Sequence, residues 1–376
     1  ERIVFLDNAE TTRVDPSIIE VMREYMLEKY GLPGGEFGYR LQEEALEALE
    51  KARQTIARRI NAEPEEIIFT SGATESNNLA LKGIAYSESY QGRRIITSKI
   101  EQRSILDVVK KMGRKGFDCV FLDVDKEGFV NLEQLERSID GVRLVSIQHA
   151  NQEIGTIQNL ETIGELCRAH NIIFHSDAAQ SFTKESIDLK KMNIDLLSIT
   201  SHLIHGPKGV GALYVREGVK LDPLFEGDER ERGLRAGSPN IPGIIGFALA
   251  VELMKKEDLE RMVGLRDDLI RKLLEIRDSK LNGPRGEKRL CNNVNITFRY
   301  VEGEALTLHA DMKGLIVNTG SACYSSRLEP SHVIRAIGGT YEEAHGSTRL
   351  TLSRWTTKEE VDYAVEVLKE AVEKLR

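Results

Sequence analysis

The sequence has few cysteines, and their spread argues against two common kinds of site. Of the 376 residues only four are cysteine, namely Cys119, Cys167, Cys291 and Cys323, and no two of them stand at C-x-x-C spacing. A disulfide framework or a zinc site built from cysteines requires closer, paired spacing. We therefore expect neither, and we expect a reducing compartment.

Long apolar runs and an excess of positive charge are also missing. No run approaches the roughly 20 apolar residues of a membrane-spanning helix, and the stretch from Glu1 to Phe5 lacks the layout of a signal peptide. The formal net charge of −8 gives no electrostatic reason to expect nucleic acid or an anionic membrane as a partner. We therefore expect a cytoplasmic protein with neither partner.

The composition is that of an ordinary globular protein, with 40% hydrophobic and 30% charged residues. Over the first two thirds, short apolar runs alternate with amphipathic helical patterns at intervals of about 25 residues, which predicts βαβ units and an α/β fold with a mainly parallel sheet. The predicted strands are Glu66–Thr70, Arg94–Ser98, Cys119–Val124, Leu144–Gln148, Ile172–Asp177, Leu196–Ile199 and Gly211–Val215. The predicted helices include Leu41–Ile60, Ser76–Ile84, Leu132–Ile139 and Leu160–His170.

The pattern changes after Asn240. One long helical zone from Ile241 to Ile276 comes first. It is followed by the segments Asn292–Phe298, Glu304–Met312, Leu315–Asn318 and Ser347–Leu352, and by a helix from Thr357. This mixture of a few strands and long helices predicts a second, smaller α+β domain.

One candidate site lies where an apolar strand meets a helix. The stretch Ile67–Asn78 runs through Ser71 and Gly72 into a helix that opens on Thr74. Free backbone N–H groups at such a helix start, with the helix dipole behind them, favour a phosphate or another anion. A tight turn at Gly72 with Thr74 as N-cap explains the same residues without a ligand. The residues alone leave both interpretations open.

A second candidate is Asp177, at the C-terminal end of the predicted strand Ile172–Asp177. Ligands of open α/β sheets bind at that edge of the sheet. The alternative is an aspartate that caps the next turn.

A third candidate is Cys323, in the polar, Gly/Ser-rich segment Asn318–His332. A cysteine in an exposed loop is a candidate nucleophile, whereas a buried cysteine is usually an inert packing residue. We interpret Cys119, on a predicted strand, and Cys167, on a predicted helix face, as packing residues. The position of Cys291, just before a strand, leaves both interpretations open.

The segment Ser198–Val215 is typical of a buried strand, a polar turn, a glycine-proline bend and a second apolar strand. It resembles the cofactor-lysine segment of the NifS/IscS-type cysteine desulfurases, class-V aminotransferases that use pyridoxal phosphate (PLP). The Thr70–Glu75 motif Thr-Ser-Gly-Ala-Thr-Glu resembles the phosphate cup of that family, and the segment that ends at Cys323 resembles its Ser-Gly-Ser-Ala-Cys loop. The resemblance runs from Leu6 to Thr357, nearly the whole chain.

The resemblance implies a homodimer of PLP fold type I with shared sites. Residues 15–250 would form the large PLP-type domain, and residues 1–14 together with 251–376 the small domain that carries the Cys323 loop. The other implied partner is an iron–sulfur scaffold or another sulfur-acceptor protein.

The resemblance also implies a role for each matching residue. Cys323 would be the catalytic cysteine that accepts sulfur as a persulfide and passes it on. Arg349 would hold the substrate carboxylate as a bidentate pair, with Asn151 as a second substrate-binding residue. Asp177 would pair with the pyridine nitrogen and keep it protonated. The other implied cofactor-binding residues are Ala73, Thr74, Gln180, Ser201, His202 and Ser238, the last reaching the other subunit's site.

Several pocket positions depart from the family. Leu203 stands where the family has the lysine that carries PLP as a Schiff base, and an alkyl side chain has no amine for that bond. Gln102 replaces a histidine that stacks on the ring. The other altered positions are Gln152 and Leu32, each in place of asparagine, Glu10 in place of alanine, and Glu226–Arg230 in place of a neutral segment. These changes remove the covalent attachment and add carboxylates near an anion site.

Three functions remain open at this point. The favoured one is a desulfurase-like protein of iron–sulfur cluster assembly or sulfur transfer that lacks desulfurase activity, with Cys323 as persulfide carrier or cluster ligand. In that case PLP binds without a Schiff base or not at all. The second is an active PLP-dependent cysteine desulfurase, which converts L-cysteine to L-alanine and a persulfide with the help of another amine; we do not expect Lys208, beyond the bend, to supply it. The third is a non-enzymatic dimer that binds a small anion.

Overall fold

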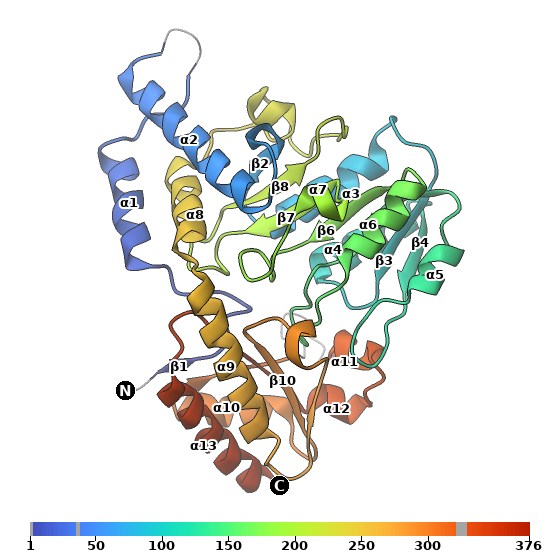
Figure 1. Cartoon of the computed structure of the whole chain (residues 1–376), viewed down its shortest axis with the longest axis vertical. Helices are drawn as coiled ribbons and strands as arrows, with labels where there is room; N and C mark the ends of the chain where they lie inside the picture. Colours follow the sequence, from blue (N-terminus) through green and yellow to red (C-terminus); the bar gives the residue numbers. More distant parts are fainter. Residues whose placement is uncertain (1–2, 35–37, 321–328) are drawn as a thin grey trace.

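The computed structural model describes residues 3–34, 38–320 and 329–376. A seven-stranded sheet, in the upper part of Figure 1, has the strand order β2-β8-β7-β6-β5-β3-β4. Its neighbouring strands are parallel except at β8, which runs antiparallel to both β2 and β7. The predicted α/β fold with a mainly parallel sheet is confirmed.

The predicted strands of this sheet are all present, with ends shifted by at most a residue or two. They are β2 (Ile67–Thr70), β3 (Arg94–Ser98), β4 (Asp118–Leu122), β5 (Val142–Ser146), β6 (Ile173–Asp177), β7 (Leu196–Thr200) and β8 (Gly211–Val215). The helices of this part are α1 (Pro16–Leu27), α2 (Arg40–Arg59), α3 (Ala73–Tyr86), α4 (Arg103–Arg114), α5 (Leu132–Arg137), α6 (Leu160–Ala169), α7 (Leu189–Met192) and α8 (Ile241–Leu253). The short 3₁₀ turns η1 (Pro64–Glu66) and η2 (Arg230–Gly233) complete it.

The large sheet is buried on both faces. Successive residues of a strand point to opposite faces, and helices cover both faces of a mainly parallel sheet. Ile96 and Val145 accordingly belong to the largest hydrophobic cluster, which includes residues of α2 and α8. Their chain neighbours Ile95 and Leu144 belong to a second cluster together with residues of α3 and α4. The continuous apolar runs of the sequence therefore come from strands that are covered twice.

The prediction of one helical zone from Ile241 to Ile276 is wrong at its middle. Helix α8 ends at Leu253, Met254 has an extended backbone (φ −79°, ψ 114°), and α9 (Lys256–Leu273) begins two residues later. The acidic residues in the first turn of α9 are a helix-start signal. The prediction missed this signal because the apolar periodicity continues across the break between the two helices. Helix α9 leads from the large sheet to the lower part of the molecule in Figure 1.

The lower part contains a four-stranded antiparallel sheet and a two-stranded parallel pair. The four strands are, in order, β12 (Asn318–Thr319), β13 (Ser347–Thr351), β10 (Asn293–Phe298) and β9 (Ser279–Leu281), and the pair is β1 (Val4–Phe5) with β11 (Leu315–Ile316). Helices α10 (Gly303–Met312), α11 (His332–Ala336), α12 (Tyr341–His345) and α13 (Lys358–Leu375) and the 3₁₀ turn η3 (Gly286–Lys288) belong here. The predicted segment Leu315–Asn318 is thus two strands of different sheets. The domain bounds 15–250 and 251–376 stay a prediction.

Residues 6–12 connect the two parts of the molecule. Leu6 O accepts a hydrogen bond from Thr351 N on β13 at 2.7 Å, and Thr12 N donates to His202 O, just past β7, at 2.9 Å. This N-terminal segment therefore lies between the small sheet and the C-terminal ends of the large sheet's central strands. Across the described residues, no helix combines the length and apolar composition that a bilayer crossing requires.

Phe247 tests the packing of α8 on the large sheet. Its side chain is fully buried, and its ring meets the edge of Phe182 with 5.8 Å between centroids. We expect Phe247→Ala to lower the free energy of unfolding by about 3–5 kcal/mol, because it leaves a cavity, and Phe247→Leu to cost clearly less. Urea denaturation with an unchanged m-value is the measurement. A loss below about 1 kcal/mol for the alanine variant would contradict this packing.

Candidate functional site

The ends of three strands bring the candidate residues to one edge of the large sheet. Thr70 at the end of β2 and Thr200 at the end of β7 both pair with Gly211, the first residue of the antiparallel β8. A Cβ on Gly211 would lie 2.7 Å from the Cα of Gly72, so only glycine allows the turn after β2 to lie this close. Asp177, at the end of β6, pairs with Ser198 of β7.

The turn between β2 and α3 has the features of an anion site. Gly72 has a φ of 149° and is the N-cap of α3, so the alternative with Thr74 as N-cap is wrong. The N–H groups of the first helical turn, which begins with Ala73 and Thr74, have no partner inside the helix. Next to Gly72, the hydroxyl of Thr200 is buried and lacks a hydrogen-bond partner among the described residues. The Ser201 hydroxyl is also buried and without a partner there, but it lies against Gly206. A buried unpaired hydroxyl is costly, and the oxygens of a phosphate at this turn would satisfy the Thr200 hydroxyl together with the N–H groups of Ala73 and Thr74.

Asp177 faces a partner that the sequence interpretation missed. Its Oδ2 accepts a hydrogen bond from Asn77 Nδ2 at 2.9 Å, and its Oδ1 accepts one from Ala179 N at 2.9 Å. The bond from Ala179 is the turn-capping contact that was the alternative interpretation. Burial raises the pKa of Asp177. A protonated ring nitrogen at this carboxyl would offset the cost of its burial, so Asp177 fits the pyridine nitrogen of PLP.

His202 and Gln180 contact the N-terminal segment. The His202 Nδ1 atom lies 3.3 Å from Thr11 Oγ1, and Gln180 Nε2 donates to Ala9 O at 3.0 Å. Burial, then the charges of Lys208 and Lys184, lower the pKa of His202. Residues 9–11 thus cover the edge of the sheet where the cofactor-binding residues were predicted.

Leu203 is buried, with 4% of its surface exposed. In the part of the chain that the structure describes, it belongs to none of the hydrophobic clusters, although its neighbour Ile204 belongs to the largest. Leu203 lies three residues beyond the end of β7, in the turn that leads to β8.

A buried glutamate, Glu101, follows the C-terminal end of β3. Glu101 accepts hydrogen bonds from Ser98 Oγ at 2.7 Å and from Gln148 N at 3.1 Å, and burial raises its pKa to about 8. Gln148 also accepts a hydrogen bond from Asn151 Nδ2 at 2.9 Å. The Asn151 Oδ1 atom accepts from two backbone N–H groups, so its amide supports the turn after residue 150. A substrate contact by Asn151 stays a prediction.

Two altered positions border this glutamate. Gln102 is the N-cap of α4 and makes no capping bond with its side chain. Gln152 Oε1 accepts from Gln148 Nε2 at 3.4 Å. Leu32, a third altered position, has 39% of its surface exposed.

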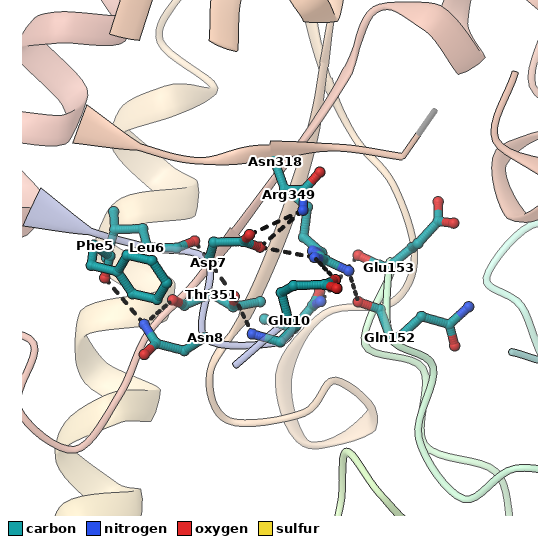
Figure 2. Close-up of polar contacts among 12 residues, drawn as sticks. Phe5, Leu6, Asp7, Asn8, Glu10, Gln152, Glu153, Asn318, Arg349 and Thr351 are labelled. Atoms are coloured by element: carbon teal, nitrogen blue, oxygen red, sulfur yellow. Dashed lines mark hydrogen bonds and ion pairs between the residues drawn. The ribbon is translucent and has the colours of Figure 1, made fainter. Parts of the chain in front are cut away.

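Arg349 on β13 lies where the N-terminal segment meets the turn at Gln152 (Figure 2). Its Nη2 pairs with Asp7 Oδ1 at 2.9 Å, and its Nη1 donates to Gln152 O at 3.2 Å. The predicted carboxylate-binding arginine is therefore buried and already paired with an acidic residue of the chain.

Ser238 and the cysteines complete the set of predicted residues. Ser238 lines a cavity of about 330 Å³ together with Ser71 and Arg235. Cys323 lies outside the described residues. Cys167 and Cys291 are buried, and burial raises the pKa of Cys291 to about 11, which makes it an inert thiol.

Known proteins resemble this chain over its whole length. The aminotransferase class-V family model matches residues 4–364. The cysteine desulfurase IscS of Dictyoglomus turgidum is 46% identical over 384 residues, which cover 100% of this chain and 96% of that protein. IscS of Methanosarcina thermophila is 47% identical over 379 residues, covering 100% and 93%. A solved NifS-like protein, 37% identical, superposes with a TM-score of 0.92 over 99% of this chain and 100% of that one.

Glu101 generates a prediction about pH. Its folded-state pKa of about 8 lies above the ordinary 4.5, so between these values the folded chain holds a proton that the unfolded chain has released. Rising pH then destabilises the fold by up to about 1.4 kcal/mol per pH unit. We expect Glu101→Gln, which stays neutral, to flatten this decline between pH 5 and 8.

Urea denaturation at pH 5, 6.5 and 8 measures the difference between wild type and Glu101→Gln. Glu133→Gln, the same change at an exposed position of α5, is the matched control and is expected to follow the wild type. Parallel curves for the wild type and Glu101→Gln would show that Glu101 is ionised in the folded protein.

Proposed function

The chain belongs to the aminotransferase class-V family and, within it, to the cysteine desulfurases of the IscS/NifS type. From this premise we propose that it transfers sulfur, for iron–sulfur cluster assembly or to another acceptor, without the desulfurase activity of its relatives. The single observation that carries the proposal is Leu203. It is a buried alkyl side chain at the end of β7, at the position where the family's cofactor lysine is expected.

Two lysines lie close enough to affect His202, and neither is a suitable replacement. Lys184 is buried, and burial lowers its pKa to about 8. Its Nζ atom, however, already donates a hydrogen bond to Gln180 O at 3.0 Å. Lys208 is exposed and lines a groove of about 520 Å³ with Thr11 and Trp355. We therefore propose that PLP has no covalent attachment in this chain.

The residues that remain fit reversible binding of PLP. The first-turn N–H groups of α3 and the hydroxyls of Thr200 and Ser201 would hold its phosphate, and Asp177 would accept a hydrogen bond from its ring nitrogen. When bound in a competent enzyme, PLP withdraws electrons from the α-carbon of an amino acid. That chemistry also needs an amine that exchanges with the substrate and moves its proton, and Leu203 has neither ability.

Sulfur transfer depends on the segment that contains Cys323, and both of its described ends meet Glu153. Ser331 Oγ donates a hydrogen bond to Glu153 Oε2, and a Cβ on Gly320 would lie 2.6 Å from the same oxygen. His332 Nε2 lies 2.9 Å from Glu101 O. Gly320 and Ser331 thus both lie next to the turn that contacts Arg349.

We propose the following step for Cys323, whose role rests on the sequence. Its thiolate attacks the outer sulfur of a donor persulfide, a new S–S bond forms, the donor's S–S bond breaks, and the donor leaves as a thiol. No net oxidation occurs, so the step needs no further reactant. Ligation of a cluster by Cys323 together with a scaffold is the other form of this function.

An active desulfurase is the second candidate. The names of the relatives favour it, because proteins called cysteine desulfurase match the whole chain at 46–47% identity. It requires an amine in place of Leu203, and that requirement separates the two candidates experimentally.

The proposed sulfur transfer predicts that sulfur can be added to Cys323. After incubation with a persulfide donor, we expect mass spectrometry to find one added sulfur on the Cys323 peptide and none in Cys323→Ser. After incubation with L-cysteine and PLP, we expect no added sulfur and no released sulfide. Catalytic sulfide release would establish the active desulfurase, and an unreactive Cys323 under both conditions would remove the transfer role and leave an anion-binding dimer.

The second prediction concerns the missing amine. Leu203→Lys is expected to give a coloured protein with PLP, fixed to the peptide containing position 203 by borohydride, but little turnover because Gln102 and Gln152 remain. Leu203→Gln, a polar side chain without a basic amine, is the control and is expected to stay colourless. Full turnover from Leu203→Lys alone would show that the other altered positions do not matter.

A further inference from the structure

Glu10 lies close to the arginine that the resemblance assigns to the substrate carboxylate, with its Oε2 atom 3.8 Å from Arg349 Nη2. We propose that Glu10 occupies the carboxylate-binding face of Arg349, so that the pocket excludes free amino acids and accepts small primary amines that lack a carboxylate. The inference rests on the proposed function in one respect, because it names the ligand class of the same pocket.

Figure 2 shows the polar contacts of the Arg349 guanidinium. The arginine is 7% exposed. Nη1 donates to Gln152 O at 3.2 Å, and Nη2 is shared between Asp7 Oδ1 at 2.9 Å and Glu10 Oε2 at 3.8 Å. Nε is buried and has no hydrogen-bond partner among the described residues. A bidentate carboxylate at the Nε–Nη2 edge would have to compete with Asp7 for Nη2 and would come close to the charge of Glu10.

The backbone fixes Glu10 at this place. Asn8 Nδ2 donates to Thr351 O at 2.8 Å, Ala9 N donates to Thr351 Oγ1 at 2.8 Å, and Glu10 N donates to Asp7 O at 3.1 Å. Thr351 is two residues beyond Arg349 on β13, so the same strand anchors the segment and carries the arginine. These hydrogen bonds therefore hold the backbone of Glu10 close to Arg349.

Asp7 has a different role from Glu10. Asn318 Nδ2 donates to both of its carboxylate oxygens, at 3.2 and 3.0 Å, and Asn318 is opposite Arg349 in the strand register. Asp7 is thus part of a fixed pair that neutralises Arg349. Glu10, whose side chain is 55% exposed, is the added charge, and the family resemblance has alanine at that position.

The charge balance of the site follows from these contacts. Asp7 offsets the charge of Arg349, and Glu10 makes the group negative. Glu153 is also close, and burial raises its pKa, so that it resists becoming a further negative charge. An incoming carboxylate meets like charge, whereas a protonated amine meets opposite charge. Because Glu10 is half exposed, the effect on affinity is moderate.

The experiment compares L-cysteine with cysteamine, the same molecule without its carboxylate. Binding to the full chain is measured by saturation-transfer NMR in reducing buffer without PLP. The variants are Glu10→Ala and Glu10→Gln, with Glu20→Ala, an exposed residue of α1, as the control for loss of one negative charge. The double variant Glu10→Ala/Arg349→Gln reports whether any gain acts through the arginine.

We expect the wild type to bind cysteamine at least as tightly as L-cysteine. Both Glu10 variants are expected to tighten L-cysteine about fivefold to tenfold and to leave cysteamine within about twofold. Glu20→Ala is expected to change neither ligand, and the double variant to lose the gain.

Three results would overturn the proposal. They are an equal L-cysteine affinity in the wild type and Glu10→Ala, an equal gain for both ligands, and no binding of either ligand to any variant. The assay contains no persulfide donor, so its outcome is independent of sulfur transfer to Cys323. Failure of this inference leaves sulfur transfer to Cys323 standing, whereas catalytic turnover of L-cysteine would overturn both proposals.

Discussion

The hydrogen bonds of residues 6–12 are the constraint on which the pocket depends. On one side Leu6 and Ala9 bond to Thr351 of β13, and on the other Thr12 bonds to His202 beyond β7. The Thr12 hydroxyl also accepts a hydrogen bond from His205 N at 2.7 Å. This segment thereby ties the small sheet to the large one where the strands β6 and β7 end. The segment thus contacts residues next to Asp177 and Leu203 on the large sheet and, through Asp7, Arg349 on the small one.

Glu153 makes contacts on both sides of the segment that contains Cys323. It is buried, it bonds to Ser331, and it leaves no room for a side chain at Gly320. A buried carboxyl with such contacts holds Gly320 and Ser331 close to the same turn. Its neighbour Gln152 bonds to Arg349 through the backbone carbonyl, so the turn links the arginine to the segment that carries Cys323.

The sequence predicted the elements better than their partners. Strand positions followed from apolar runs, because strands covered on both faces must be apolar throughout. The break at Met254 and the split after Ile316 were missed, because each depends on a local backbone turn inside an unbroken apolar pattern. Asp177 was identified from its place at a strand end, but Asn77 was not, because only the packing of α3 on the sheet brings them together.

Leu203 and Glu10 are coupled through the charge of the pocket. The resemblance predicts a lysine and an alanine at these positions, so this chain has one positive charge fewer and one negative charge more than expected. The pocket nevertheless buries Asp177 and Glu101, and burial raises the pKa of both carboxyls. Buried carboxyls without a cation nearby tend to be protonated, which lowers the cost of keeping them without a ligand. Such a change of charge would disfavour the anionic group of an amino acid and favour a cation, as we propose above. Relative to what the resemblance predicts, each of the two substitutions therefore makes the net charge more negative by one unit.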